Sequence, residues 1–167
     1  MPDIEEYWMQ KALKLAERAE ALGEVPVGAL VVLDGEVIGE GWNQPISGCD
    51  PTAHAEMMAL RAAAKQQNNY RLPNADLYVT LEPCTMCAGA IVHSRVARVI
   101  FAAPEPKAGA VVSNGNIFDR PEMNHQVEYR AGVCEASAVE MIQSFFRRRR
   151  KETKDARKAQ KREAGED

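Results

Sequence analysis

Residues 74–94 read NADLYVTLEPCTMCAGAIVHS, and this stretch decides the fold that we expect. Its first part, Asn74 to Leu81, is short and mostly apolar, which is typical of a buried strand. Pro83 follows closely and suits the first turn of a helix, so we predict a helix over residues 84–94. A buried strand that leads directly into a helix is the usual building unit of α/β proteins.

The rest of the chain continues this alternation of helices and strands. Helices are predicted over residues 4–22, 53–65 and 134–150, and strands over 27–33, 37–39, 96–102 and 126–129. Asp34-Gly35 marks a hairpin turn, and the Pro, Gly and Asn residues of 103–123 predict a long functional loop. We therefore predict an α/β domain with three α/β/α layers around a central mixed five-stranded sheet.

Length and composition indicate one globular domain. The chain has 167 residues, of which 46% are hydrophobic and 27% charged. We assign residues 1–150 to the domain and 151–167 to a basic tail that could extend the last helix. The longest apolar run, Ala29 to Leu33, is far shorter than a membrane span, and the acidic N-terminus does not resemble a signal peptide. These features predict a cytoplasmic protein without a membrane partner.

Charge is distributed unevenly along the chain. Residues 147–162 hold ten Lys and Arg residues and two acids, whereas the preceding residues are acidic on balance. A basic segment of this kind either contacts nucleic acid or forms a solvated helix end. Charge alone does not decide between the two.

Two short motifs carry the chemistry: His54-Ala55-Glu56 and Pro83-Cys84-Thr85-Met86-Cys87. Each is expected at the start of a helix, where free N–H groups favour a thiolate. Cys84 and Cys87 stand three residues apart, so both sulfurs can reach one ion. With His54 they supply three ligands, which leaves one zinc position for water, and bound zinc lowers the pKa of that water to about 7. Glu56 then stands where it could carry protons, so we predict one catalytic Zn²⁺ per subunit.

Other interpretations of the cysteines remain open. The C-x-x-C pair could be a redox pair, or half of a structural zinc site completed by Cys49 or Cys134. The combination of H-A-E with P-C-x-x-C favours the catalytic site, because it is the signature of zinc deaminases that act on nucleobases.

Longer strings resemble one family in particular, the bacterial tRNA-specific adenosine deaminases of the cytidine deaminase-like superfamily. The similarity covers about residues 5–150. H-A-E and P-C-x-x-C mark only the superfamily, and the other strings are closer to the tRNA enzymes. These strings are Glu24-Val25-Pro26-Val27-Gly28-Ala29, Gly39-Glu40-Gly41-Trp42-Asn43, Asp50-Pro51-Thr52, Leu77 to Glu82, Ala88-Gly89-Ala90, His93-Ser94-Arg95 and Phe145-Phe146-Arg147.

This resemblance implies a cytidine deaminase-like fold, a homodimer and a specific reaction. The expected substrate is the wobble adenosine in the anticodon stem-loop of an arginine tRNA, which is converted to inosine with release of ammonia. Glu56 would protonate N1 of the base and later the leaving amine.

The resemblance also implies substrate contacts. Asn43 matches a position that binds the flipped base, and the pocket is expected to include Val25, Leu81 and Glu82. RNA contacts are expected from His93, Glu105, Lys107, Phe145, Phe146, Arg147 and Arg149. Ordinary roles remain open for several: Val25, Leu81 and one Phe as core, Asn43 as a loop cap, His93 as a helix end, and the arginines as solvated side chains.

One loop departs from the family pattern. The family reads Asp-x-Lys-Thr-Gly-Ala, whereas this chain reads Glu105-Pro106-Lys107-Ala108-Gly109-Ala110 after Pro104. The change leaves the choice between RNA and DNA open.

Two rival functions also remain open. A deaminase of a free base, nucleoside or nucleotide would share the zinc site but need no RNA surface. A non-catalytic, zinc-stabilised RNA-binding subunit would have no need of Glu56.

Overall fold

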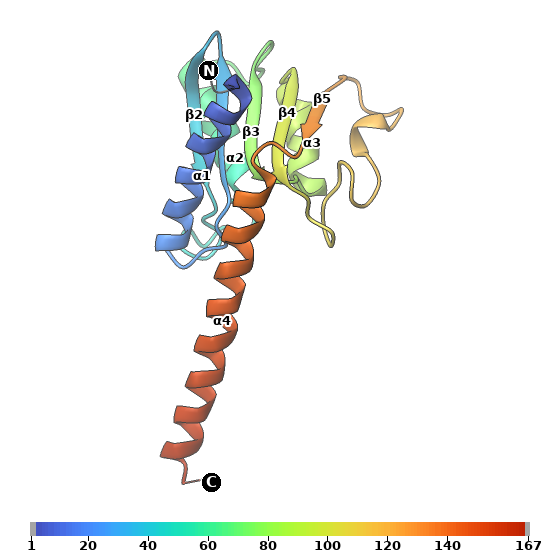
Figure 1. The fold of residues 1–167 in the computed structure, drawn as a ribbon. Coiled ribbons are helices and arrows are strands. Elements are labelled where there is room, and N and C mark those ends of the chain that lie inside the picture. The colour runs from blue at the N-terminus through green and yellow to red at the C-terminus, as the bar shows by residue number, and fades with distance from the viewer. Residues whose placement is uncertain (1–2, 166–167) are drawn as a thin grey trace.

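A mixed five-stranded sheet forms the centre of the protein. The computed structural model describes residues 3–165 (Figure 1). The strands lie in the order β2-β1-β3-β4-β5, and β1 is antiparallel to both neighbours, whereas β3, β4 and β5 are parallel. Their bounds are β1 Gly28–Leu33, β2 Glu36–Trp42, β3 Asp76–Leu81, β4 Arg98–Ala103 and β5 Glu128–Ala131. The predicted mixed sheet is confirmed.

Helices cover both faces of this sheet, as predicted. Helices α1 (Ile4–Ala21) and α4 (Glu135–Glu163) pack on one face, around a core that includes Trp8, Tyr78 and Ile100. Helices α2 (Ala55–Gln67) and α3 (Thr85–Ser94) pack on the other face. The result is a three-layer α/β/α domain.

Two of the predicted strands differ from the observed ones. Strand β2 is longer than the predicted 37–39, because it pairs with β1 from Leu33 to Gly28. Strand β5 lies two residues later than predicted, and all four of its residues are exposed. No alternation of buried and exposed positions therefore marked its place in the sequence. The Asp34-Gly35 turn is confirmed, and both residues have positive φ angles, 52° and 77°.

Two glycines allow α2 to approach the sheet closely. A Cβ atom on Gly41 would lie 2.3 Å from the carbonyl oxygen of Ala55, and one on Gly39 would lie 2.5 Å from that of Ala59. Neither position can hold a larger residue without moving α2. The start of α2 is therefore pressed against β2.

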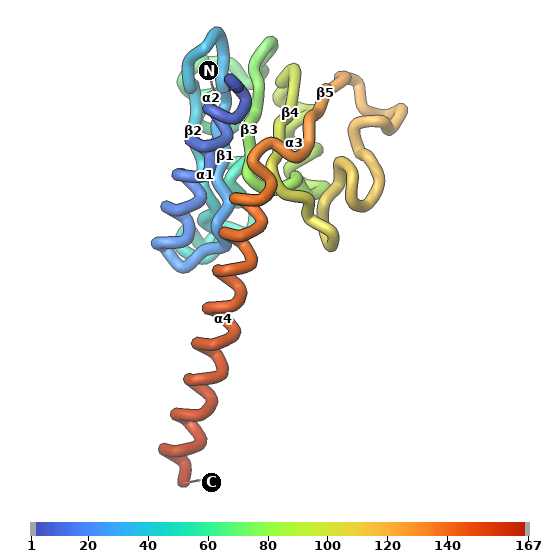
Figure 2. The backbone as a smooth tube through the Cα atoms, viewed as in Figure 1, coloured from blue at the N-terminus to red at the C-terminus, as the bar shows by residue number. Residues whose placement is uncertain are grey.

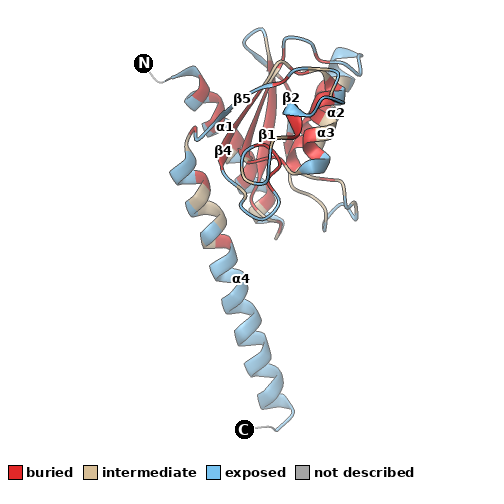
Figure 3. Ribbon diagram, turned by 90° about the vertical axis from the view of Figure 1, so that its right-hand side faces the viewer, coloured by how far each residue is buried: buried red, intermediate tan, exposed pale blue. Residues whose placement is uncertain are grey.

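Helix α4 extends well beyond the domain (Figures 1 and 3). Its first turn packs on the sheet through Ala138, Phe145 is buried further along, and every residue from Phe146 to Gly165 is exposed. This outer part consists mostly of Arg, Lys, Glu, Ala and Gln, which favour helix without needing a core. Among the described residues, no helix is both long and apolar enough for a bilayer.

A long connection joins β4 to β5, in the region where a functional loop was predicted (Figure 2). It contains one 3₁₀ turn, Ile117–Asp119, which the side chain of Asn116 caps. Ile117 and Phe118 are buried against the α2 and α3 side of the sheet. The connection is therefore anchored by its own apolar residues rather than lying free on the surface.

Candidate active site

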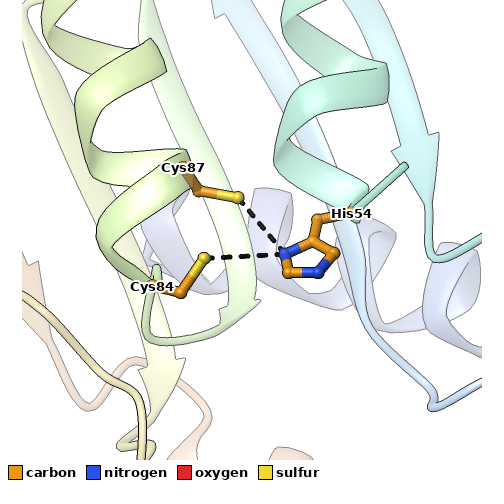
Figure 4. Close-up of side chains that lie close together, drawn as sticks. All are labelled: His54, Cys84 and Cys87. Carbon is orange, nitrogen blue, oxygen red and sulfur yellow. Dashed lines mark hydrogen bonds between the residues drawn. The ribbon is translucent and has the colours of Figure 1, made fainter. Parts of the chain in front are cut away.

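Three side chains able to bind a metal meet at one end of the sheet. The Nδ1 atom of His54 lies 3.6 Å from the sulfur of Cys84 and 3.5 Å from the sulfur of Cys87 (Figure 4). The ligand atoms of all three residues lie within 4.8 Å of one another. The three residues that the two motifs singled out are thus brought together in space.

Two helix starts produce this cluster. His54 is the residue before the first turn of α2, and Cys84 holds the same position in α3. Neither side chain makes a capping hydrogen bond to its own helix, so both remain available for a metal ion. Cys87 is in the first turn of α3, on the side of Cys84. Both helix dipoles therefore present their positive ends to the sulfurs.

The spacing of the three ligand atoms fits a tetrahedral zinc ion. Zinc binds sulfur at about 2.3 Å and imidazole nitrogen at about 2.0–2.1 Å, so two such tetrahedral ligands stand about 3.6 Å apart. The two observed nitrogen-to-sulfur distances agree with this value. Three ligands also leave a fourth position for water or substrate.

Without a metal ion, the three side chains of the cluster differ in how readily they lose a proton. The hydrogen bond from Cys87, together with a weaker effect of His54, lowers the pKa of Cys84 to about 4, against the effect of burial. The same bond, together with burial, raises the pKa of Cys87. The bond to Cys84 also raises the pKa of His54, although burial opposes it. A bound cation would favour loss of the remaining proton.

Glu56 lies beside this cluster, in the first turn of α2. Its side chain is only 4% exposed. Burial raises the pKa of Glu56, and its backbone hydrogen bond and the charge of His54 only partly oppose this effect. A raised pKa means that this carboxyl group binds a proton more readily than an exposed one, which suits a group that carries protons.

The other two cysteines do not join the site. Cys49 is exposed in the loop before α2, and Cys134 precedes α4. Within residues 3–165, His54, Cys84 and Cys87 form the one group of three or more residues placed to hold a metal. The geometry therefore offers no fourth cysteine ligand of the kind a structural zinc site would need.

Asn43 joins the loop after β2 to the start of α2. Its Oδ1 atom accepts a hydrogen bond from the backbone N–H of Ala55 at 2.9 Å. This contact ties the amide group of Asn43 to the backbone between His54 and Glu56. The other two predicted pocket residues, Val25 and Leu81, are partly buried and pack against the core.

Glu82 is placed differently from the expectation of a pocket-lining carboxylate. It is 2% exposed, and its two oxygens accept hydrogen bonds from the loop that includes Glu105 and Ser113. Burial raises the pKa of Glu82, but the bonds from Ser113, Val112 and Glu105 outweigh this effect and lower it overall. The side chain is therefore occupied by protein donors rather than free for a substrate.

The aromatic pair in α4 is divided between core and surface. Phe145 is buried, so it is not free to stack on a base, whereas Phe146 is 42% exposed. Arg149 stacks over the ring of Phe145 and donates a hydrogen bond to the carbonyl oxygen of Gly23. Arg147 pairs with Glu140 at 3.0 Å. Of the two aromatic rings, Phe146 is therefore the one available to stack on a base.

An open pocket of about 370 Å³ lies between α4 and the loops that precede β1 and α2. It is bounded by Phe146 and Arg149 on one side and by Val25 and Asn43 on the other. Two sets of predicted residues that are far apart in the sequence thus share one surface. The remaining predicted contacts, His93 and Lys107, are exposed, and Glu105 is half-buried in the loop after β4.

Glu24 is a buried residue that the sequence interpretation did not select for a role. It is 2% exposed, and its carboxylate accepts hydrogen bonds from the backbone N–H groups of Ile46 and Ser47, at 3.3 and 2.7 Å. Glu24 thereby holds the loop that connects Asn43 to His54. The sequence around Glu24 does not reveal this role, because the residues that donate to its carboxylate lie more than twenty positions away.

Comparison with known proteins reveals the family. Residues 2–103 match the model described as the cytidine and deoxycytidylate deaminase zinc-binding region. The chain is 53% identical to the tRNA-specific adenosine deaminase of Haemophilus influenzae over 153 residues, which cover 91% of this chain and 88% of that protein. This chain belongs to the tRNA-specific adenosine deaminases.

Other members of this family agree in sequence and in structure. The tRNA-specific adenosine deaminase of Bacillus subtilis is 45% identical over 92% of this chain and 96% of its own length. A solved structure from work on A-to-I editing by tRNA:A34 deaminases at the wobble position of transfer RNA is 44% identical. It superimposes with a TM-score of 0.79 and covers 81% of this chain and 98% of its own.

In this tRNA-specific adenosine deaminase, the match to the zinc-binding region divides the chain. His54, Glu56, Cys84 and Cys87 all lie within residues 2–103, whereas the loop after β4 and all of α4 lie outside. The metal-ligating cluster therefore falls in the part of the chain that the broader deaminase family model describes.

Proposed function

We propose that the protein is a zinc-dependent hydrolase that converts adenosine to inosine at the wobble position of tRNA. The observation that supports this most strongly is the cluster of His54, Cys84 and Cys87 beside the buried Glu56. The names of relatives that are 40–53% identical favour tRNA adenosine over a free base. Within that activity, an arginine tRNA is the proposed substrate.

His54, Cys84 and Cys87 are the residues that would hold one zinc ion. When bound, zinc lowers the pKa of a coordinated water so that hydroxide is available near neutral pH. The overall change consumes one water: the C6–N bond to the amino group breaks, a C6–O bond forms, and ammonia leaves.

Glu56 moves the protons in this proposal. Its raised pKa allows it to accept a proton from the attacking water and to pass that proton to N1 of adenine. The carboxylate then takes the second proton of that water from the hydroxyl group now on C6 and passes it to the leaving amine, which departs as ammonia. Burial supports this role, because it shields the carboxyl group from bulk water.

Asn43 orients the base. Its Oδ1 atom already accepts the Ala55 N–H, so the side-chain NH₂ group is the part that remains to donate to an acceptor on the flipped adenine. Val25 and Leu81 would bound the pocket with apolar surface, in keeping with their half-buried state. A flat base held in this way presents its C6 atom to the cluster.

RNA outside the base is bound by exposed aromatic and basic groups. Phe146 offers a stacking surface next to Asn43, and His93 and Lys107 lie exposed elsewhere on the domain. The outer part of α4 adds what we call the basic face, which consists of Arg150, Lys154, Arg157, Lys158 and Lys161. The acids Glu152, Asp155 and Glu163 do not line this surface. Such a charge arrangement complements the phosphates of an RNA stem.

A homodimer in the cytoplasm is part of the same proposal. Met86 and Val112 are exposed apolar side chains near the start of α3 and in the β4–β5 connection, and a partner subunit would cover them. A cytoplasmic location agrees with four cysteines that are all unpaired.

Deamination of a synthetic anticodon stem-loop tests the proposal. RNA with adenosine at the wobble position should yield inosine, and the same RNA with guanosine there should not react. Conversion of free adenosine, cytosine or guanine without conversion of the RNA would instead support the free-base alternative.

A further inference from the structure

The buried carboxylate of Glu82, two residues before Cys84, accepts five hydrogen bonds from the loop that follows β4. Its Oε2 atom accepts the backbone N–H groups of Val111, Val112 and Ser113 at 3.0, 2.8 and 3.0 Å. Its Oε1 atom accepts the N–H of Glu105 at 3.0 Å and the hydroxyl of Ser113. Four backbone amides and one hydroxyl therefore converge on one buried carboxylate.

The donors come from both ends of one loop, residues 105–113. The loop turns back on itself, since the N–H of Gly109 donates to the carbonyl of Glu105 at 2.8 Å. At Gly109 an added Cβ atom would lie 2.3 Å from the carboxyl carbon of Glu82 and 2.6 Å from the Glu105 carbonyl oxygen. The glycine is therefore what allows the loop to close around the Glu82 side chain.

The same loop is attached to the start of α3. Gly109 forms an isolated antiparallel bridge with Cys84, and the N–H of Ala110 donates to the carbonyl of Pro83 at 2.9 Å. Glu82 thus stands at the junction of β3, the Cys84 segment and the loop. Movement of its carboxylate would release the backbone of Glu105, and with it Lys107, whose N–H donates to the Glu105 side chain.

Among the described residues, no Lys, Arg or His side chain pairs with this carboxylate, so the N–H and O–H dipoles of the loop balance its charge. This arrangement needs a hydrogen-bond acceptor at both oxygen positions of the side chain. A neutral amide in the same place has only one acceptor, and its NH₂ group would face the donors at the other position.

We propose that Glu82 is a positioning residue, which holds loop 105–113 against the Cys84 segment so that the loop can receive the RNA backbone. This inference rests on the proposed action on RNA. It predicts a different effect for each end of the loop. In Glu82→Gln, the amide oxygen can stay with the three N–H groups at residues 111–113. The NH₂ group then faces the N–H of Glu105, which loses its acceptor, whereas the Ser113 hydroxyl can turn and accept.

The first test is trypsin cleavage of the purified zinc-bound protein, with the fragment that ends at Lys107 followed by mass spectrometry. In the wild type the Lys107–Ala108 bond should be cut slowly. In Glu82→Gln we expect faster cleavage, by about tenfold, with the zinc content unchanged. The matched control is Glu24→Gln, which removes another buried, loop-holding carboxylate and should leave the rate at Lys107 unchanged.

The second test is the kinetics of the same variants on the anticodon stem-loop. A positioning role predicts that Glu82→Gln raises KM for the RNA by about tenfold and changes kcat by less than about twofold. A change confined to kcat, or loss of zinc, would overturn the proposal, and so would unchanged cleavage at Lys107.

A milder variant covers the case in which Glu82→Gln does not fold. Ser113→Ala removes one of the five donors and should speed cleavage at Lys107 to a smaller extent. Wild-type behaviour in that variant, with Glu82→Gln unfolded, would also count against the proposal. The cleavage test does not depend on activity. If the wild type did not act on RNA, the proposed function would be contradicted, but the role of Glu82 in holding loop 105–113 would not.

Discussion

The Oδ1 atom of Asn43 accepts a hydrogen bond from the backbone N–H of Ala55, the residue between His54, a proposed metal ligand, and Glu56, the proposed proton carrier. The N–H of Ala55 is one of the free donors at the start of α2, so Asn43 satisfies the helix end from outside the helix. One side chain can thus serve both the fold and the substrate.

Two substitutions of Asn43 separate these roles. Asn43→Asp keeps the acceptor for the Ala55 N–H but loses the NH₂ donor, so we expect near-normal stability and at least about tenfold lower kcat/KM. Asn43→Ala loses both groups and should also lose about 1 kcal/mol of unfolding free energy. Urea unfolding and stem-loop kinetics measure the two effects. Equal activity in wild type and Asn43→Asp would show that the NH₂ group has no part in binding the base.

Glu56→Gln tests the proton carrier. Glutamine has nearly the same shape but cannot accept and return a proton, so we expect kcat to fall by about 10²–10⁴-fold. The zinc content and the melting temperature should be retained, because the three ligands are untouched. Glu17→Gln, on the exposed side of α1, is the control and should be fully active. Activity within tenfold of wild type in Glu56→Gln would remove this residue from the mechanism.

The basic face of α4 is tested with two matched pairs of substitutions. Arg150→Gln with Arg157→Gln changes two residues of that face, whereas Lys151→Gln with Arg162→Gln removes the same charge from outside it. We expect only the first pair to weaken tRNA binding. The slope of log Kd against log salt should also become shallower by about 0.7–0.9 for each RNA phosphate that the variant no longer neutralises. Identical binding by both pairs would mean that general charge, not this face, attracts the RNA.

Glu24 makes the stability of the protein depend on pH. Burial raises the pKa of Glu24, but the bonds from Ser47 and Ile46 and the charge of Arg149 outweigh it, so the folded-state pKa is lowered. The ionised Glu24 carboxylate therefore adds its full contribution to the free energy of unfolding above the pKa of the unfolded state, about 4.3. That contribution is lost as the pH falls through the pKa of Glu24 in the folded state.

Glu24→Gln should remove this pH dependence. At neutral pH we expect the variant to be about 1–3 kcal/mol less stable than the wild type, because the amide accepts fewer hydrogen bonds. Urea unfolding from pH 7 down to pH 3 should show that difference shrinking as the wild-type carboxylate becomes protonated. A difference that stays constant with pH would contradict the assignment.

The metal-ligating cluster could be predicted from sequence because its signals are local. Cys84 and Cys87 stand three residues apart, and the helix that positions them begins at Thr85, between the two. Glu82, Phe145 and Arg149 were harder, since their partners are distant in the chain. Ser113 lies 31 residues from Glu82, and Gly23 lies 126 residues from Arg149. A charged or aromatic residue that such a partner occupies looks the same in sequence as one that is free to bind RNA.

The fold shows the same division. The buried strands β1, β3 and β4 were predicted within about two residues, because their apolar runs mark them. Strand β5 is fully exposed and was displaced, and the length of α4 follows from helix propensity rather than from packing.

Conversion of the wobble adenosine of a tRNA to inosine is the reaction on which the proposed roles of the zinc site, Glu56 and Asn43 all depend. Incubation of total bacterial tRNA with the purified zinc-bound protein, followed by sequencing, measures this directly because inosine is read as guanosine. We expect an adenosine-to-guanosine change at the wobble position of an arginine tRNA, and no change with Glu56→Gln. An unchanged wobble adenosine, or changes scattered over other adenosines, would contradict the proposed function.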